Sequence, residues 1–229
     1  MKICLLSDIH GNNHSFKAAL PLMRNHNAKY TIFLGDICGY YFETIEIWRC
    51  LSNIPGLIAL SGNHDALFLQ FAAQGFVPAA YTEKYGPALS ILLEHDPNEL
   101  QLFLTWLKGL RHFYHDPAGR FSCFHGGPSA PATEYVYPDT PLPDSTVPFV
   151  FMGHTHCPML RQGEGTIFCN PGSLGQPRHG SQASFAIMDL DNSRWQWDVY
   201  TVEFDREALI ASIASRGALP HYLIDILRR

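Results

Sequence analysis

The stretch "KICLLSDIHGN", residues 2–12, decides the fold, because its pattern is repeated along the first third of the chain. An apolar run over Lys2–Ser7 predicts a short buried strand, and polar residues follow it at once. A helix is predicted next over Ser15–Arg24, where apolar side chains recur at helical spacing. A second apolar strand is predicted over Tyr30–Leu34, and Gly35 ends it.

Further along, the pattern continues with a predicted helix over Glu43–Leu51 and a third strand over Leu57–Leu60. Alternating strands and helices favour a parallel sheet with right-handed crossovers, so we predict an α/β protein. In such sheets ligands bind at the carboxyl ends of the strands, and we expect a functional site there.

The remainder of the chain is expected to complete the same domain. Residues 66–108 favour helices, and 113–202 favour short strands between Gly/Pro turns. Six prolines between 127 and 148 predict a rigid surface loop. We find no repeat and no long linker, so we predict a single domain over 1–229 with a helical insertion at about 66–108.

Composition narrows the class of protein. The 229 residues carry a net charge of −5 and no long Lys/Arg run, which disfavours binding to long nucleic acids but not to a small nucleotide. The apolar start is too short for a signal-peptide core, and no run reaches the roughly 18 apolar residues of a membrane span. Six cysteines without a CxxC pair predict reduced, buried thiols. We therefore expect a cytoplasmic protein without membrane contact.

Side chains able to bind a metal follow the predicted strands. Each has an ordinary explanation alone: Asp8 could cap a helix, and His125 could be a core histidine. At successive strand ends, beside glycines that permit close approach, they predict one site. In chain order they are Asp8, His10, Asp36, Asn63, His64, His125, His154 and His156.

The segment "GHTH", residues 153–156, separates two histidines by one residue. In an extended segment such side chains lie on one face, so His154 and His156 are predicted to point at one site or at two neighbouring sites. A pair of surface imidazoles is the alternative explanation.

The donor set indicates which ions would bind. Two carboxylates, four imidazoles and one amide, without a thiolate, favour Mn, Fe, Co, Ni or Zn over Ca or Mg. Seven donors exceed one tetrahedral site and suit two ions that share a carboxylate. Such pairs, about 3.5–4 Å apart, activate a bridging water and stabilise phosphoryl transfer.

The ordered blocks D-x-H, G-D, G-N-H-D, H-G and G-H-T-H resemble those of the calcineurin-like metallophosphoesterase superfamily, from Asp8 to Arg178. The stretch "NPGSLGQPR", residues 170–178, resembles one in the small bacterial phosphodiesterase-like branch. The resemblance implies a four-layer α/β/β/α sandwich of two mixed sheets with helices outside. It also implies hydrolysis of a small phosphodiester, nucleotide or phosphomonoester by a metal-bridged hydroxide.

The resemblance also implies a role for each donor. One metal would be held by Asp8, His10 and His156. The second would be held by Asn63, His125 and His154, with Asp36 bridging the two ions. His64 corresponds to the family's general acid, which protonates the leaving oxygen or stabilises the transition state.

Residues outside the blocks are candidates for substrate contact. Arg178 could pair with a phosphate, and Asn12 could orient the substrate or satisfy the backbone of the Asp8 loop. Asp65 could orient His64 or cap a helix starting at about Ala66. The segment "FHGGPSAP", residues 124–131, departs from the His-Gly-Ser-Pro of many relatives, which affects the expected substrate and not the metal site.

Two other functions compete with hydrolysis of a small ester. The first is a catalytically weak scaffold on the same fold that binds a protein partner; His64, altered in such relatives, is retained here. The second is a nuclease on long DNA or RNA, which the acidic balance disfavours. The apolar aromatic residues allow a homodimer.

Overall fold

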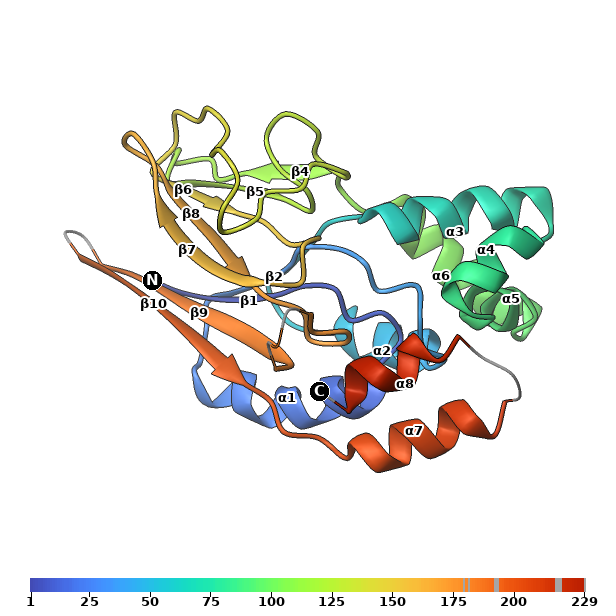
Figure 1. Cartoon of the computed structure of the whole chain (residues 1–229). Coiled ribbons are helices and arrows are strands. Elements are labelled where there is room, and N and C mark those ends of the chain that lie inside the picture. The colour runs from blue at the N-terminus through green and yellow to red at the C-terminus, as the bar shows by residue number, and fades with distance from the viewer. Residues whose placement is uncertain (179, 181, 192–193, 217–219, 229) are drawn as a thin grey trace.

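The chain folds around two sheets of five strands, as seen in a computed structural model that describes residues 1–178, 180, 182–191, 194–216 and 220–228 (Figure 1). The first sheet has the order β10-β9-β1-β2-β3, and the second β4-β5-β6-β8-β7. Both sheets contain parallel and antiparallel pairs, so the two predicted mixed sheets are confirmed.

The first sheet contains the parallel strands that the sequence predicts. β1 pairs with β2, and β2 with β3, all in parallel. Helices α1 (Asn13–Asn25) and α2 (Thr44–Leu51) form the two crossovers. The strands are β1 (Lys2–Leu6), β2 (Tyr30–Phe33), β3 (Leu57–Ala59), β9 (Ser184–Asp191) and β10 (Arg194–Thr201).

The second sheet holds one strand that sequence patterning missed. This strand, β7 (Pro158–Gln162), pairs antiparallel with β8 at the sheet edge. It alternates buried and exposed residues over only five positions and begins with a proline, so its apolar signal is weak. The other strands are β4 (Phe113–His115), β5 (Phe121–Phe124), β6 (Phe149–Phe151) and β8 (Ile167–Pro171).

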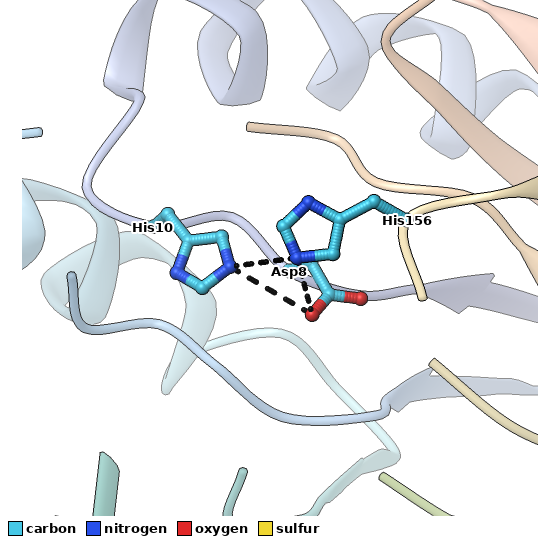
Figure 2. A group of neighbouring side chains, drawn as sticks. All are labelled: Asp8, His10 and His156. Atoms are coloured by element: carbon cyan, nitrogen blue, oxygen red, sulfur yellow. Dashed lines mark hydrogen bonds and ion pairs between the residues drawn. The ribbon is translucent and has the colours of Figure 1, made fainter. Parts of the chain in front are cut away.

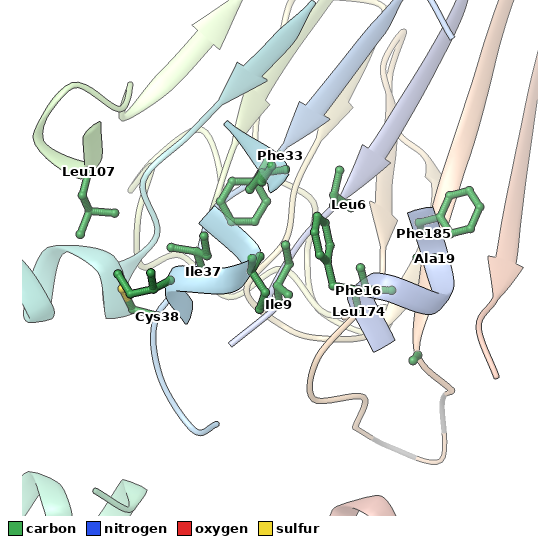
Figure 3. Close-up of a cluster of buried hydrophobic side chains, with 14 of the residues drawn as sticks. Leu6, Ile9, Phe16, Ala19, Phe33, Ile37, Cys38, Leu107, Leu174 and Phe185 are labelled. Atoms are coloured by element: carbon green, nitrogen blue, oxygen red, sulfur yellow. The ribbon is translucent and has the colours of Figure 1, made fainter. Parts of the chain in front are cut away.

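Two apolar layers hold the sheets in place. Between the sheets, Leu5 and Ile32 belong to one buried cluster with Phe151. On the outer face of the first sheet, Phe33 packs in a second cluster with Phe16 of α1 (Figure 3). Burial of each such side chain away from water stabilises the folded state by roughly 1.5–3 kcal/mol. The strand ends that carry the polar residues are thereby anchored to a rigid core.

The outer face of the second sheet differs from the expected helical layer. Within the described residues, the proline-rich segment 127–148 covers it: Val136, Leu142 and Val147 pack in one cluster with Val150. Six prolines remove backbone donors and fix φ, which prevents a helix there. The fourth layer is therefore a loop.

Helices also follow β3 and the last strand. Those after β3 are α3 (Asn63–Gln74), α4 (Ala79–Tyr85), α5 (Ala88–Leu93) and α6 (Pro97–Lys108). That they form an insertion into a single domain stays a prediction. Near the C-terminus, α7 (Arg206–Ala214) and α8 (Tyr222–Leu227) pack against Tyr40 and Tyr41. Among the described helices, none has both the length and the apolar character needed to cross a bilayer.

Candidate metal centre

The polar residues at the strand ends come together in two groups. Asp8, His10 and His156 form the first group, and Asp36, His125 and His154 form the second. In each group one potential ligand atom per residue lies within 4.8 Å of the others. All six side chains are buried, so their polar atoms are withdrawn from water.

The first group is joined by three close contacts (Figure 2). The Nε2 atoms of His10 and His156 lie 3.2 Å apart. The Nε2 atom of His156 is 3.4 Å from Asp8 Oδ1, and that of His10 is 3.8 Å from the same oxygen. Three donor atoms thus face one point from two loops that are far apart in the sequence.

The second group is joined to the first through Asp36. Its Oδ2 atom lies 3.3 Å from Nε2 of His125 and 3.8 Å from Nε2 of His10. Asn63, at the first turn of α3, places Oδ1 3.1 Å from Nε2 of His125. The structure therefore brings all seven predicted ligands together, with one carboxylate between the two groups.

Backbone carbonyls fix the orientation of three imidazoles. Nδ1 of His10 hydrogen-bonds Cys38 O at 2.8 Å, and Nδ1 of His125 hydrogen-bonds Leu34 O at 2.9 Å. Nδ1 of His156 bonds a third carbonyl, on Gln176, at 2.5 Å. A carbonyl accepts only, so each Nδ1 carries a proton and each Nε2 is the atom that faces the centre.

The donor atoms are arranged in a way that suits binding to cations better than hydrogen bonding to one another. Asp8 Oδ1 and His154 Nε2 are buried without a hydrogen-bond partner among the described residues. Two Nε2 lone pairs that face each other, as in His10 and His156, repel unless a proton or a cation lies between them. Buried polar groups without partners destabilise a fold, and divalent ions would satisfy them.

Electrostatics keep this site in a form that binds cations. Burial alone would raise the pKa of Asp36, but the imidazoles of His125, His64 and His10 outweigh it and hold that pKa well below its usual range. Burial lowers the pKa of His154 to about 4. Burial also lowers the pKa of His125, but the Asp36 carboxylate outweighs it and raises that pKa to about 9, so a proton and a cation compete for this nitrogen.

The ligand loops adopt a backbone conformation that the sequence did not reveal. Asp8, His10, Asp36, His154 and His156 all have φ between 49° and 65°. Such left-handed non-glycine residues cost about 1–3 kcal/mol each and cluster at functional sites. The expectation that His154 and His156 share a face of an extended segment is therefore wrong. The turn at this position instead sends one imidazole to each group.

Asp65 braces two of these loops, and neither predicted role describes it fully. Its carboxylate accepts hydrogen bonds from the backbone N–H groups of Asp36 (2.9 Å), Cys38 (3.0 Å) and Gly62 (3.0 Å). The helix starts at Asn63, not at Ala66, so Asp65 lies inside its first turn. Burial, with Asp36 nearby, raises the pKa of Asp65 to about 6.

The stretch 170–178 also acts through its backbone. Leu174 N donates to Ser7 O and Gly175 N to Asp8 O, at 3.0 and 2.9 Å. A Cβ atom on Gly175 would lie 1.8 Å from Ile9 O, so only glycine permits this approach. The segment thereby holds the Asp8 loop in place.

The remaining predicted residues separate into two kinds. His64 and Arg178 line a cavity of about 150 Å³ beside the ligands. Asn12 does not: it is fully buried, its Oδ1 accepts from Ser15 N, and its Nδ2 donates to Gly175 O. The structure therefore gives Asn12 a backbone role, at the start of α1 and against the 170–178 segment, which argues against the predicted substrate contact.

Three tyrosines of the cavity wall were missed at the sequence level. Tyr40, Tyr85 and Tyr135 line it together with Arg178. Tyr85 belongs to α4, in the stretch predicted to be helical, and Tyr135 to the proline-rich loop. Neither position carries a local signal for a site.

Comparisons with known proteins agree with this geometry. The family model for the calcineurin-like phosphoesterase superfamily domain matches residues 1–193. The uncharacterized protein MJ0912 of Methanocaldococcus jannaschii is 31% identical, over 96% of this chain and 95% of its own. Phosphodiesterase YfcE of Escherichia coli is 24% identical, over 83% and 89%. A metallophosphoesterase structure from Sphaerobacter thermophilus has a TM-score of 0.77 at 25% identity, over 100% and 98%.

Proposed function

This chain belongs to the calcineurin-like phosphoesterase superfamily, and from that membership we propose that it hydrolyses a small phosphodiester, nucleotide or phosphomonoester with two divalent metal ions. The observation that carries the proposal is the convergence of seven donors into two groups around Asp36. Mixed nitrogen and oxygen donors favour Mn, Fe, Co, Ni or Zn.

The proposed ligands follow the two groups. Asp8, His10 and His156 hold one ion, and Asn63, His125 and His154 hold the other. Asp36 contacts both, because its Oδ2 lies within 3.8 Å of a donor in each group. When bound, the cations supply positive charge to the phosphoryl oxygens and lower the pKa of a water.

The other side chains of the cavity bind and orient the ester. His64 faces the substrate from the start of α3 and offers a hydrogen bond to its oxygens. The cavity of about 150 Å³ is small, which supports a compact phosphate ester as the substrate.

The direct test is hydrolysis by purified, metal-stripped protein reloaded with Mn²⁺, Ni²⁺, Co²⁺ or Zn²⁺. We expect cleavage of bis-p-nitrophenyl phosphate, p-nitrophenyl phosphate or both, together with two bound ions per chain by mass spectrometry of metals. Stripped protein should be inactive. Stoichiometric metal binding without hydrolysis of any ester in a wide panel would overturn the proposal and favour the scaffold function.

Arg178 is proposed to bind the substrate phosphate. Its Nη2 atom donates to Tyr40 Oη and to Gln176 Oε1, both at 2.8 Å, which holds the guanidinium at the cavity wall. Arg178→Met should raise KM by about 10- to 100-fold, the effect of losing a charge-assisted hydrogen bond, with a smaller change in kcat. Steady-state kinetics would measure this, with Arg24→Met on α1 as the control. An unchanged KM would contradict the assignment.

The cellular compartment and the oligomeric state of the chain are also proposals. All six cysteines are free thiols, and five are buried as predicted, whereas Cys50 is exposed. Free thiols are typical of reducing compartments, which supports a cytoplasmic location. A homodimer remains a proposal that sedimentation would test.

A further inference from the structure

The ring of His64 has a specific partner on a different helix. Its Nδ1 atom lies 2.9 Å from the hydroxyl oxygen of Tyr81, which is carried by α4, 17 residues further along the chain. Both side chains are buried, at 7% and 8% exposure. A hydrogen bond in such surroundings is stronger than one in water and restricts the ring more.

The other groups near His64 do not form a hydrogen bond of this kind with its ring. The carboxylate of Asp65 is occupied by backbone N–H groups. Rings of His10, Tyr40 and Tyr85 surround His64 at centroid distances of 5.1–5.6 Å, as van der Waals neighbours. Among the residues that the structure describes, Tyr81 is thus the only side chain that hydrogen-bonds the His64 ring.

We propose that Tyr81 is a positioning residue, whose hydroxyl donates to Nδ1 of His64 and so leaves Nε2–H as the donor that faces the substrate. The inference rests on the proposed function for its catalytic consequence, but the position of the proton on His64 stands apart from it. Asp36, Asn63 and His156 line the same cavity as His64. A neutral imidazole bonded at Nδ1 by an O–H group carries its own proton on Nε2.

Two further observations concern this contact. Burial raises the pKa of the Tyr81 phenol, so the hydroxyl keeps its proton and remains a donor. The backbone of Gly39 lies close to the same nitrogen, since a Cβ atom there would lie 3.1 Å from Nδ1 of His64. The Tyr81 hydroxyl and the Gly39 backbone together restrict rotation of the ring. In this way α4 acts on the site without contributing a ligand.

The proton position can be measured on metal-free protein by nitrogen-15 NMR of labelled histidines. We expect His64 of the wild-type chain to show the Nε2–H tautomer, and Tyr81→Phe to show a mixture of both tautomers. Tyr30→Phe, at the far end of β2, removes a hydroxyl elsewhere and should leave the His64 signals unchanged. A wild-type Nδ1–H tautomer, or an identical tautomer in Tyr81→Phe, would overturn the proposal.

Kinetics separate positioning from a structural role. Tyr81→Phe should lower kcat about tenfold, as loss of an orienting partner does, with KM little changed. In a His64→Ala background the same substitution should cost nothing more, because Tyr81 acts only through that ring. An equal loss in both backgrounds would show a structural effect instead. If wild-type protein hydrolyses no ester, the proposed function fails, while the NMR result still decides the role of Tyr81.

Discussion

Replacing Asp36 by alanine is expected to lower kcat/KM by about 10³-fold or more, because one side chain serves both metal groups. Its Oδ2 lies between Nε2 of His10 and Nε2 of His125, at 3.8 and 3.3 Å. Its Oδ1 accepts from the backbone N–H of His64 at 2.9 Å, so the loop that carries His64 loses a partner too. Without this carboxylate, only Asp8 would supply negative charge among the seven donors, and two neighbouring cations would repel each other more strongly.

The metal content provides a second readout for the Asp36 variant. The wild-type chain should bind two ions, and Asp36→Ala at most one under the same loading conditions. Asp198→Ala, on edge strand β10, removes a carboxylate far from the centre and should keep both ions and full activity. Circular dichroism would verify that the variant is folded. Two tightly bound ions in folded Asp36→Ala would refute a shared carboxylate.

His64→Ala should give the second large effect, a loss in kcat of about 10²- to 10⁴-fold, the range for acid–base groups. His64 lies in neither ligand group but lines the cavity beside both. We therefore expect the variant to retain two ions, in contrast to Asp36→Ala. His14→Ala, on α1 and ion-paired at the surface with Glu43, is the matched control. Full activity of His64→Ala would exclude any catalytic role for this ring.

Leaving groups distinguish the two roles considered for His64. Burial lowers the pKa of His64, which favours the neutral ring as a hydrogen-bond donor to the transition state. In that case the loss in His64→Ala should be similar for aryl and alkyl leaving groups. If the ring instead protonates the leaving oxygen, the loss should grow steeply as the leaving group becomes more basic. Measuring kcat over a series of phenyl and alkyl esters would decide between them.

The donors themselves were accessible from the sequence because each follows a short apolar run. Hydrophobic residues such as Ile3 and Leu5 define β1, and the parallel order places Asp8 at the same sheet edge as Asp36. The types of side chain then restrict the chemistry to nitrogen- and oxygen-binding metals. None of these inferences needs knowledge of how distant segments pack.

Other features depended on packing and carried no local signal. The contact between Tyr81 and His64 exists because α4 folds back onto the start of α3. The Asp65 brace joins loops 27–29 residues away from it in the chain. Asn12 shows the converse: a residue beside the site by sequence proved to be a helix cap, because the loop turns its side chain inward.

The sequence by itself determined the alternation of strands and helices in the first third of the chain, the seven donors and the kind of ion they suit, because these follow from local patterns of apolar and polar residues. Local patterns did not give the division of the donors into two groups, which the family resemblance implied. Tertiary structure decided the backbone path that produces this division, since His154 and His156 diverge through a left-handed turn and not along a strand. It also decided which groups orient them. That division depends on long-range contacts between loops, which the packed core holds against the strain in their backbones.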